Sequence, residues 1–277
     1  MKKLFLLSTI ISCTFYLALA QNSAPAYGNN PEAGKYAPVN GIRMYYEIYG
    51  EGKPLLLIHG NGGSVFSSRE QIPFFSKYYK VIALESRGQG KTNDNSDSLT
   101  YDQMADDINA FLDFLKIDSA YIFGQSDGAI LGLILAIRYP KKVKMLAAMA
   151  PNTRPDSAAL YPTVITRHNN DAIRFADSVK LGYKEYIPKL KLVRLMQYHP
   201  HISTAELATI QAPVMIMSGD RDVITLSHIV EMFRAIPKSQ LCVLPGSTHF
   251  ALRQNAAVFN ETIQRFFTKP FEMPKSL

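Results

Sequence analysis

The sequence predicts an α/β protein in which a mostly parallel sheet of eight strands is flanked by helices and carries a small helical cap. Short, wholly apolar runs recur along the chain, as is typical of strands buried on both faces of a parallel sheet. Segments with helical spacing of apolar residues separate these runs. One long interval without any strand-like run interrupts the alternation, and it predicts a helical insertion.

Eight segments are expected to form the sheet. The segments 35–39 and 42–49 predict a hairpin, because the Asn40-Gly41 pair between them favours the tight turn that joins antiparallel strands. The other six strands are expected at the apolar runs 55–58, 81–84, 121–123, 145–149, 214–217 and 241–244.

Helices are expected at 100–115, where Thr100 has the character of an N-cap, at 127–138 and at 255–267. The interval 153–205 contains amphipathic stretches at 172–181 and 183–196. Such an insertion should lie over the carboxyl ends of the strands, where ligands bind in open α/β sheets. The sequence therefore predicts a core formed by residues 35–152 and 206–270, with residues 153–205 as the cap.

The first 20 residues differ from the rest of the chain. A basic start at Lys2 and Lys3, an apolar run and an Ala-Leu-Ala site ending at Ala20 predict a secretory signal peptide. Residues 21–34 then form a flexible segment of an exported protein, periplasmic or secreted, with no stable membrane insertion after cleavage. The alternative is a lipoprotein anchored through Cys13.

Composition narrows the function classes. The 277 residues include 47% hydrophobic and 19% charged residues, which is ordinary for one globular domain with an insertion. The net charge of +7 comes without a dense Lys/Arg block, so nucleic-acid binding is not indicated. Cys242 alone remains after signal cleavage, so no internal disulfide is expected.

The segment 124–128, Gly-Gln-Ser-Asp-Gly, carries the strongest functional signal. It follows an expected strand and precedes an expected helix, which is the context of a G-x-S-x-G nucleophile elbow. The turn exposes the hydroxyl of Ser126 at a helix N-terminus, where developing negative charge is stabilised. Ser126 is therefore the candidate nucleophile.

Two later loops offer a base and an acid. His249 follows the last expected strand, and Asp220 and Asp222 follow the strand at 214–217. The order Ser, Asp, His along the chain is the one that a nucleophile elbow requires. His59 follows the strand at 55–58, and we expect it to shape its loop by hydrogen bonding rather than to act as the base.

Together with the "RGQGKT" segment after residue 85, these motifs resemble the α/β-hydrolase superfamily across residues 36–267. The resemblance implies oxyanion-hole amides at Asn61 and Asp127, and it favours Asp222 over Asp220 by its spacing from the preceding glycine. Glu85 departs from the usual aspartate of the superfamily, at a position that is not expected to be catalytic.

The elbow and the "AIRYP" segment at 136–140 are also similar to the biphenyl-hydrolase-like group, which includes amino-acid ester hydrolases. Ala129 departs from the second glycine common in that group. This narrower resemblance implies that the carboxylate of Asp127 binds a substrate ammonium group. The alternative is that the carboxylate only favours the helix N-terminus.

These residues predict acyl transfer from a small ester-like substrate to water through an acyl-enzyme, without a metal or organic cofactor. A carboxylic ester hydrolase ranks first. A lactonase, an amidase or a carbon–carbon bond hydrolase of the same fold remains open; the last would require basic anchoring groups such as Arg154, Arg167, Arg174 or Arg194. The alternative of another class is an inactive ligand-binding protein on this scaffold.

Overall fold

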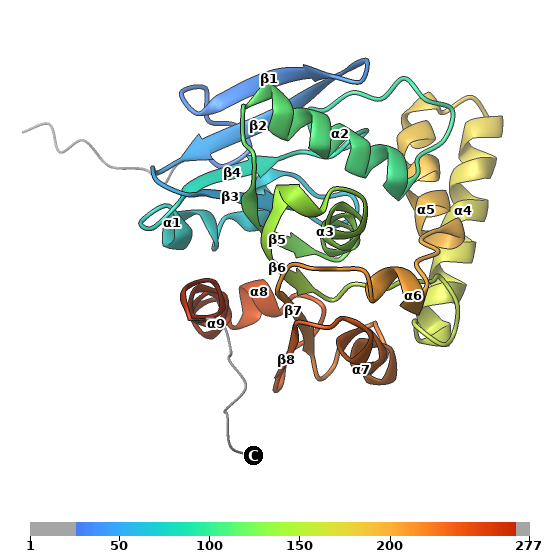
Figure 1. Ribbon diagram of the computed structural model, residues 1–277. Helices are drawn as coiled ribbons and strands as arrows, with labels where there is room; N and C mark the ends of the chain where they lie inside the picture. Colours follow the sequence, from blue (N-terminus) through green and yellow to red (C-terminus); the bar gives the residue numbers. More distant parts are fainter. Residues whose placement is uncertain (1–25, 270–277) are drawn as a thin grey trace, which may run out of the picture.

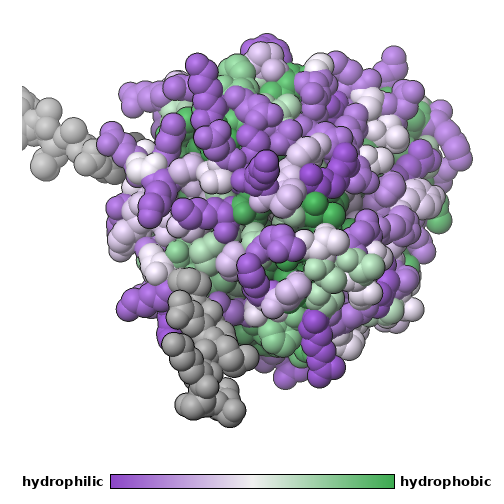
Figure 2. Space-filling view, viewed as in Figure 1, coloured by the Kyte–Doolittle hydropathy of each residue, from purple (hydrophilic) through white to green (hydrophobic). Residues whose placement is uncertain are grey.

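The computed structural model describes residues 26–269 (Figure 1). The expected signal peptide at 1–20, the lipoprotein alternative at Cys13 and the first part of the flexible segment 21–34 lie outside these residues. Among residues 26–269, no helix has the length and apolarity that crossing a bilayer requires. Hydrophilic side chains predominate on the face seen in Figure 2, and apolar surface is scattered among them.

Eight strands form one sheet in the order β1-β2-β4-β3-β5-β6-β7-β8. The pairings of β2 with β1 and with β4 are antiparallel, and the other pairings are parallel. The mostly parallel eight-stranded sheet confirms the predicted fold class. The strands are β1 Gly34–Val39, β2 Ile42–Tyr49, β3 Pro54–Ile58, β4 Lys80–Leu84, β5 Ala120–Gln125, β6 Val143–Met149, β7 Val214–Gly219 and β8 Ser239–Leu244.

Helices cover the sheet on both faces. They are α1 Ile72–Phe75, α2 Tyr101–Phe114, α3 Asp127–Arg138, α4 Pro162–Lys180, α5 Ile187–Tyr198, α6 Thr204–Leu207, α7 Leu226–Ala235, α8 Ala251–Gln254 and α9 Ala256–Thr268. The hydroxyl of Thr100 accepts a hydrogen bond from the Gln103 N–H (3.2 Å), so Thr100 caps α2 as predicted. Residues 127–136 of α3 are all buried, because α3 packs between the sheet and α2.

The insertion between β6 and β7 consists of α4, a short 3₁₀ turn at Lys184–Tyr186, α5 and α6. Figure 1 shows α4 and α5 side by side at one end of the molecule, where they pack on each other. Helix α4 begins at Pro162, ten residues before the start expected at 172. Proline is accommodated in a first helical turn, because the N–H that it lacks would have no intrahelical partner there. Only Val164 of α4 is buried, so the hydrophobic pattern gave little signal for its first half.

Strand β8 differs from its prediction as a strand buried on both faces. It is the last strand in the sheet order and pairs only with β7. Leu241 and Val243 are therefore 37% and 38% exposed. Cys242 is half-buried on the opposite face.

The strand order brings the functional loops together. The chain runs from β3 to β4 on one side, and later from β5 to β6 on the other, so the direction of winding reverses between β3 and β5. Such a reversal opens a crevice at the carboxyl ends of the two strands. The loops after β3 and β5 meet at this crevice, and the insertion lies beside it.

Candidate active site

Ser126 lies on a sharp turn between β5 and α3. Its φ of 53° is in the left-handed region, which is strained for a residue with a side chain. The turn requires its two glycines, because a Cβ on Gly124 would lie 2.1 Å from the carbonyl oxygen of Gly128. A Cβ on Gly128 would lie equally close to the carbonyl oxygen of Ile58 on β3. The backbone therefore has the form of the predicted elbow.

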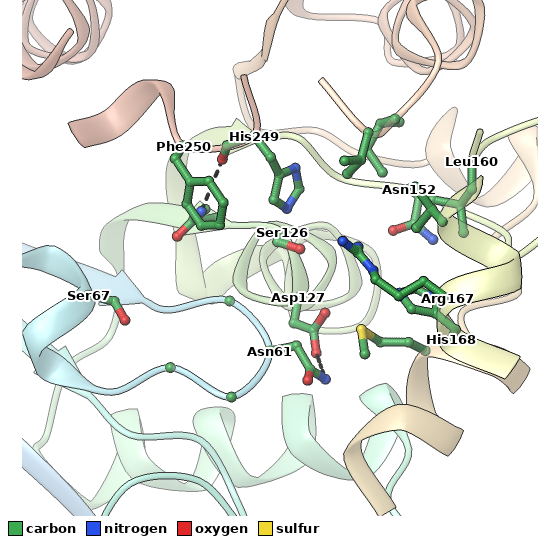
Figure 3. Close-up of a pocket in the computed structure, with 18 of the residues that line it drawn as sticks. Asn61, Ser67, Ser126, Asp127, Asn152, Leu160, Arg167, His168, His249 and Phe250 are labelled. Atoms are coloured by element: carbon green, nitrogen blue, oxygen red, sulfur yellow. Dashed lines mark hydrogen bonds between the residues drawn. The ribbon is translucent and has the colours of Figure 1, made fainter. Parts of the chain in front are cut away.

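The structure brings His249 and Asp222 together. Their loops follow the paired strands β8 and β7, and His249 Nδ1 lies 2.7 Å from Asp222 Oδ1. The same Oδ1 atom accepts hydrogen bonds from the N–H groups of Val223 (2.7 Å) and Ile224 (3.2 Å). Because a carboxylate only accepts, His249 carries its proton on Nδ1 and leaves Nε2 as the free base. Figure 3 shows the His249 ring next to Ser126.

Asp220, the other candidate acid, has a different environment. Its Oδ1 atom accepts a hydrogen bond from the backbone N–H of Ser247 at 3.2 Å. This bond joins the loop after β7 to the loop that carries His249. Asp220 therefore supports the position of the base through the backbone rather than by contact with the imidazole.

The loop after β3 is held by buried hydrogen bonds. His59 is 3% exposed; its Nδ1 lies 2.7 Å from the carbonyl oxygen of Gly60, and its Nε2 accepts from the Ser86 N–H at 3.0 Å. Burial lowers the pKa of His59 to about 4, so the ring is neutral and both nitrogens are engaged. The side chain of Gln89 accepts from the N–H of Gly62 (2.6 Å) and fixes the next part of the loop.

Asn61 and Asp127, the two predicted oxyanion-hole residues, both line the pocket beside Ser126. Asn61 follows β3, and Asp127 is the first residue of α3. The first N–H groups of a helix have no partner within the helix, so they are available to an anion at this position. The parallel pairing of β3 with β5 sets the distance between the two loops.

The carboxylate of Asp127 is buried within the same site and is only 3% exposed. Its Oδ2 atom accepts a hydrogen bond from the side-chain amide of Asn61 at 2.9 Å, and the hydroxyl of Tyr101 donates a hydrogen bond to the same carboxylate. Burial raises the pKa of Asp127, and these two hydrogen bonds oppose that shift. The Asn61 amide also donates to the carbonyl oxygen of Leu192 in α5 (3.3 Å). Neither the role of Tyr101 nor this second role of Asn61 is predicted by the sequence, because contacts between distant segments leave no local pattern.

A pocket of about 480 Å³ opens above Ser126 and contains all the candidate site residues except Asp222. This size suits a small molecule. Its cap-side wall includes Val164, Arg167, His168, Asp171, Met196 and His199, and its opposite wall includes Phe250 and Arg253. Arg253, which sequence reasoning missed, comes one helical turn after His249. Within residues 26–269, no cluster of three or more His, Cys, Asp or Glu side chains is arranged to hold a metal ion.

Of the four cap arginines considered from the sequence, only Arg167 lines this pocket. Arg154 forms an ion pair with Glu231 at 2.6 Å, and Arg174 forms one with Asp171 at 2.7 Å. Arg194 is exposed on α5. The structure thus narrows the possible basic anchoring groups of the cap to one.

Comparison with known proteins identifies the fold. The family described as "alpha/beta hydrolase fold" matches residues 53–169. The enol-lactonase from Burkholderia xenovorans superposes with a TM-score of 0.71 at 23% identity, over 85% of this chain and all of that one. A thermophilic esterase from Thermogutta terrifontis gives a TM-score of 0.70 at 20% identity, over 85% and 98% of the two chains. The chain therefore has the α/β-hydrolase fold.

Curated relatives have sequence identities close to those of the solved structures. The uncharacterized hydrolase YraK of Bacillus subtilis is 26% identical over 55% of this chain and 54% of its own length, so this match spans about half of that protein. The 2-hydroxymuconate semialdehyde hydrolase of a Pseudomonas species is 26% identical over 87% of this chain and 96% of its own. These relatives and structures include a semialdehyde hydrolase, an enol-lactonase and an esterase.

Proposed function

We propose that the protein is a serine hydrolase that cleaves a carboxylic ester, or a related acyl bond, of a small molecule. The observation that carries the proposal is the convergence of three loops on one pocket. Ser126 stands on the strained elbow, His249 is held by Asp222 at 2.7 Å, and Asn61 and Asp127, whose N–H groups are the proposed oxyanion donors, line the same pocket. This arrangement has the elements of a serine triad.

In the first half of the reaction, the hydroxyl oxygen of Ser126 attacks the substrate carbonyl carbon while Nε2 of His249 accepts the hydroxyl proton. Asp222 stabilises the imidazolium that forms. The amides of Asn61 and Asp127 donate to the developing oxyanion, and each such donor contributes about 3–4 kcal/mol to transition-state stability in comparable sites. His249 then donates its proton to the leaving alcohol, which departs and leaves Ser126 acylated.

In the second half, a water molecule attacks the acyl carbon as His249 accepts one of its protons. The oxyanion forms at the same two amides. The bond to Ser126 breaks, the proton returns to the serine oxygen, and the carboxylic acid product leaves. No external reductant, oxidant or metal ion enters this sequence of steps.

A carbon–carbon bond hydrolase is the second candidate. It is supported by the similarity to 2-hydroxymuconate semialdehyde hydrolase over nearly the full length of that protein. Arg167 also supplies the basic group that this candidate would require in the pocket. We rank the ester hydrolase first, because the pocket and the triad fit ester cleavage without any further assumption about substrate electronics.

The test is a screen of p-nitrophenyl and amino-acid esters against the purified mature protein, with Ser126→Ala as the control. We expect at least one ester to be cleaved by the wild type and not by the variant. A fluorophosphonate probe should label the wild type and fail to label Ser126→Ala. If the wild type is neither labelled nor active on any ester, the protein is a binding protein on this scaffold and the proposal is wrong.

A further inference from the structure

Two guanidinium groups line the pocket from different walls. Arg167 projects from α4 of the cap, and Figure 3 shows its side chain pointing toward Ser126. Arg253 projects from α8, on the side of the pocket formed by His249 and Phe250. Among residues 26–269, neither arginine forms an ion pair with a carboxylate, whereas Arg154 and Arg174 both do.

Arg253 is partly buried and has one hydrogen-bond donor that is unsatisfied within residues 26–269. Its Nε atom is buried without a hydrogen-bond partner among the described residues, and its guanidinium lies 5.5 Å from the ring centre of Phe250. Burial, and then the positive charge of Arg69, lower the pKa of Arg253, while Glu70 has the opposite effect. The residue as a whole is partly exposed, so this Nε–H group is the part of the guanidinium that burial leaves unsatisfied.

The negative groups of the pocket are engaged elsewhere. Asp127 accepts hydrogen bonds from Asn61 and Tyr101, and Asp171 forms its ion pair with Arg174. His168, beside Arg167, has a pKa that burial and the charge of Arg167 both lower, so at neutral pH it adds no positive charge but can donate a hydrogen bond. The guanidinium groups of Arg167 and Arg253 are therefore left without a carboxylate partner among the described residues of the pocket.

We propose that the pocket selects substrates that carry a carboxylate, or another anionic group, in addition to the bond that is cleaved. Arg167 pairs with this group, and Arg253 contributes to the favourable field from the other wall. A guanidinium matches the geometry of a carboxylate through two parallel N–H···O bonds. This inference rests on the proposed function, since it names the substrate class of the same site.

Matched ester pairs test the proposal. p-Nitrophenyl hydrogen adipate and p-nitrophenyl hexanoate share the scissile bond and the acyl chain length, and differ in a terminal carboxylate. 4-Acetoxybenzoate and phenyl acetate place the same difference on the leaving group. For at least one pair, we expect the wild type to prefer the anionic ester in kcat/KM, and Arg167→Gln to reduce that preference at least tenfold.

Two further variants sharpen the comparison. Arg167→Lys keeps the charge and should retain a larger part of the preference than Arg167→Gln. Arg194→Gln removes an exposed cap arginine that does not line the pocket, and it should leave the preference of the wild type unchanged. Since an ion pair in a partly open pocket is screened, the preference should also weaken as the salt concentration rises.

The outcomes separate this inference from the proposed function. If esters are cleaved but neither pair shows a preference that depends on Arg167, the anion site is refuted and the hydrolase stands. If no ester is cleaved, calorimetric titration with adipate, and with neutral adipamide as control, still tests the site. Binding of adipate that weakens in Arg167→Gln would support the anion site, and equal binding in both proteins would refute it.

Discussion

Replacement of Asp222 by asparagine removes one charge from the site with almost no change of shape. Oδ1 of Asp222 accepts from two backbone N–H groups as well as from His249 Nδ1. The carbonyl oxygen of an asparagine will therefore occupy the Oδ1 position, and His249 will keep its proton on Nδ1. The NH₂ group must then occupy the Oδ2 position, where the carboxylate has no partner among residues 26–269.

The expected loss follows from the distance between the two groups. At 2.7 Å, and with an effective dielectric constant of ~20, a carboxylate stabilises an imidazolium by about 6 kcal/mol before solvent and relaxation are considered. The neutral hydrogen bond that remains returns about 1 kcal/mol. The difference of about 5 kcal/mol corresponds to a decrease in kcat of about three to four orders of magnitude.

The assay is the kcat of each purified variant on an ester found in the screen, with a thermal melt to establish that the variant is folded. The unsatisfied NH₂ group should reduce the free energy of unfolding by about 1–3 kcal/mol, which must not be mistaken for a loss of catalysis. Asp220→Asn is the matched control, because an amide oxygen can still accept from the Ser247 N–H; we expect kcat within about threefold of the wild type. A loss below tenfold in Asp222→Asn, or a larger loss in Asp220→Asn, would refute the assignment of the acid.

Four further predictions concern the site, the stability and the export of the protein. Ser126→Ala and His249→Ala should each lower kcat by at least about three orders of magnitude, and the double variant should lose little more, because a triad acts as a unit; losses that multiply would contradict this. Asp127→Asn removes the charge of the elbow carboxylate and keeps its size. A selective loss of about tenfold or more in kcat/KM on an α-amino ester, relative to its deaminated analogue, would support ammonium binding. An equal change in kcat/KM on both esters would assign a structural role to Asp127. Burial lowers the pKa of His59 from 6.5 to about 4. The stabilising contribution of the neutral ring to the free energy of unfolding is therefore fully present above pH 6.5 and declines by about 3 kcal/mol as the pH falls to 4. In urea titrations, His59→Gln should remove this decline, and an unchanged pH dependence would contradict the prediction. Mass spectrometry of the natively expressed protein should find Gln21 as the N-terminus if the proposed signal peptide is cleaved. A diacylated Cys13 would establish the lipoprotein instead, and an intact Met1 would exclude both.

The framework of this fold could be predicted because its signals are local. A buried parallel strand is marked by consecutive apolar residues, and the elbow by two glycines that no other residue could replace at 2.1 Å from a backbone carbonyl. The sequence therefore located all eight strands and the core helices α2, α3 and α9, but not α7. The prediction that β8 is buried on both faces was wrong, because the composition of a strand does not show whether it lies at the edge of a sheet.

The walls of the pocket could not be predicted in the same way. The roles of Tyr101 and Arg253 depend on which segments the fold places beside Ser126, and neither residue belongs to a motif. Among the cap arginines, the sequence could not separate those held by Glu231 or Asp171 from the one that faces the nucleophile. Which side chains form ion pairs between distant segments depends on the tertiary structure, and the periodicity of the sequence does not predict it.

The side chain of Asn61 has a consequence for any motion of the cap. Its side-chain amide donates to the carboxylate of Asp127 and to the carbonyl oxygen of Leu192, while its backbone N–H is one of the proposed oxyanion donors. If α5 is displaced outward to admit a substrate, the bond to Leu192 must break, and the loop that carries this N–H loses one of its supports. In the proposed mechanism, such a displacement would remove a support from an oxyanion donor, and the return of α5 would restore it.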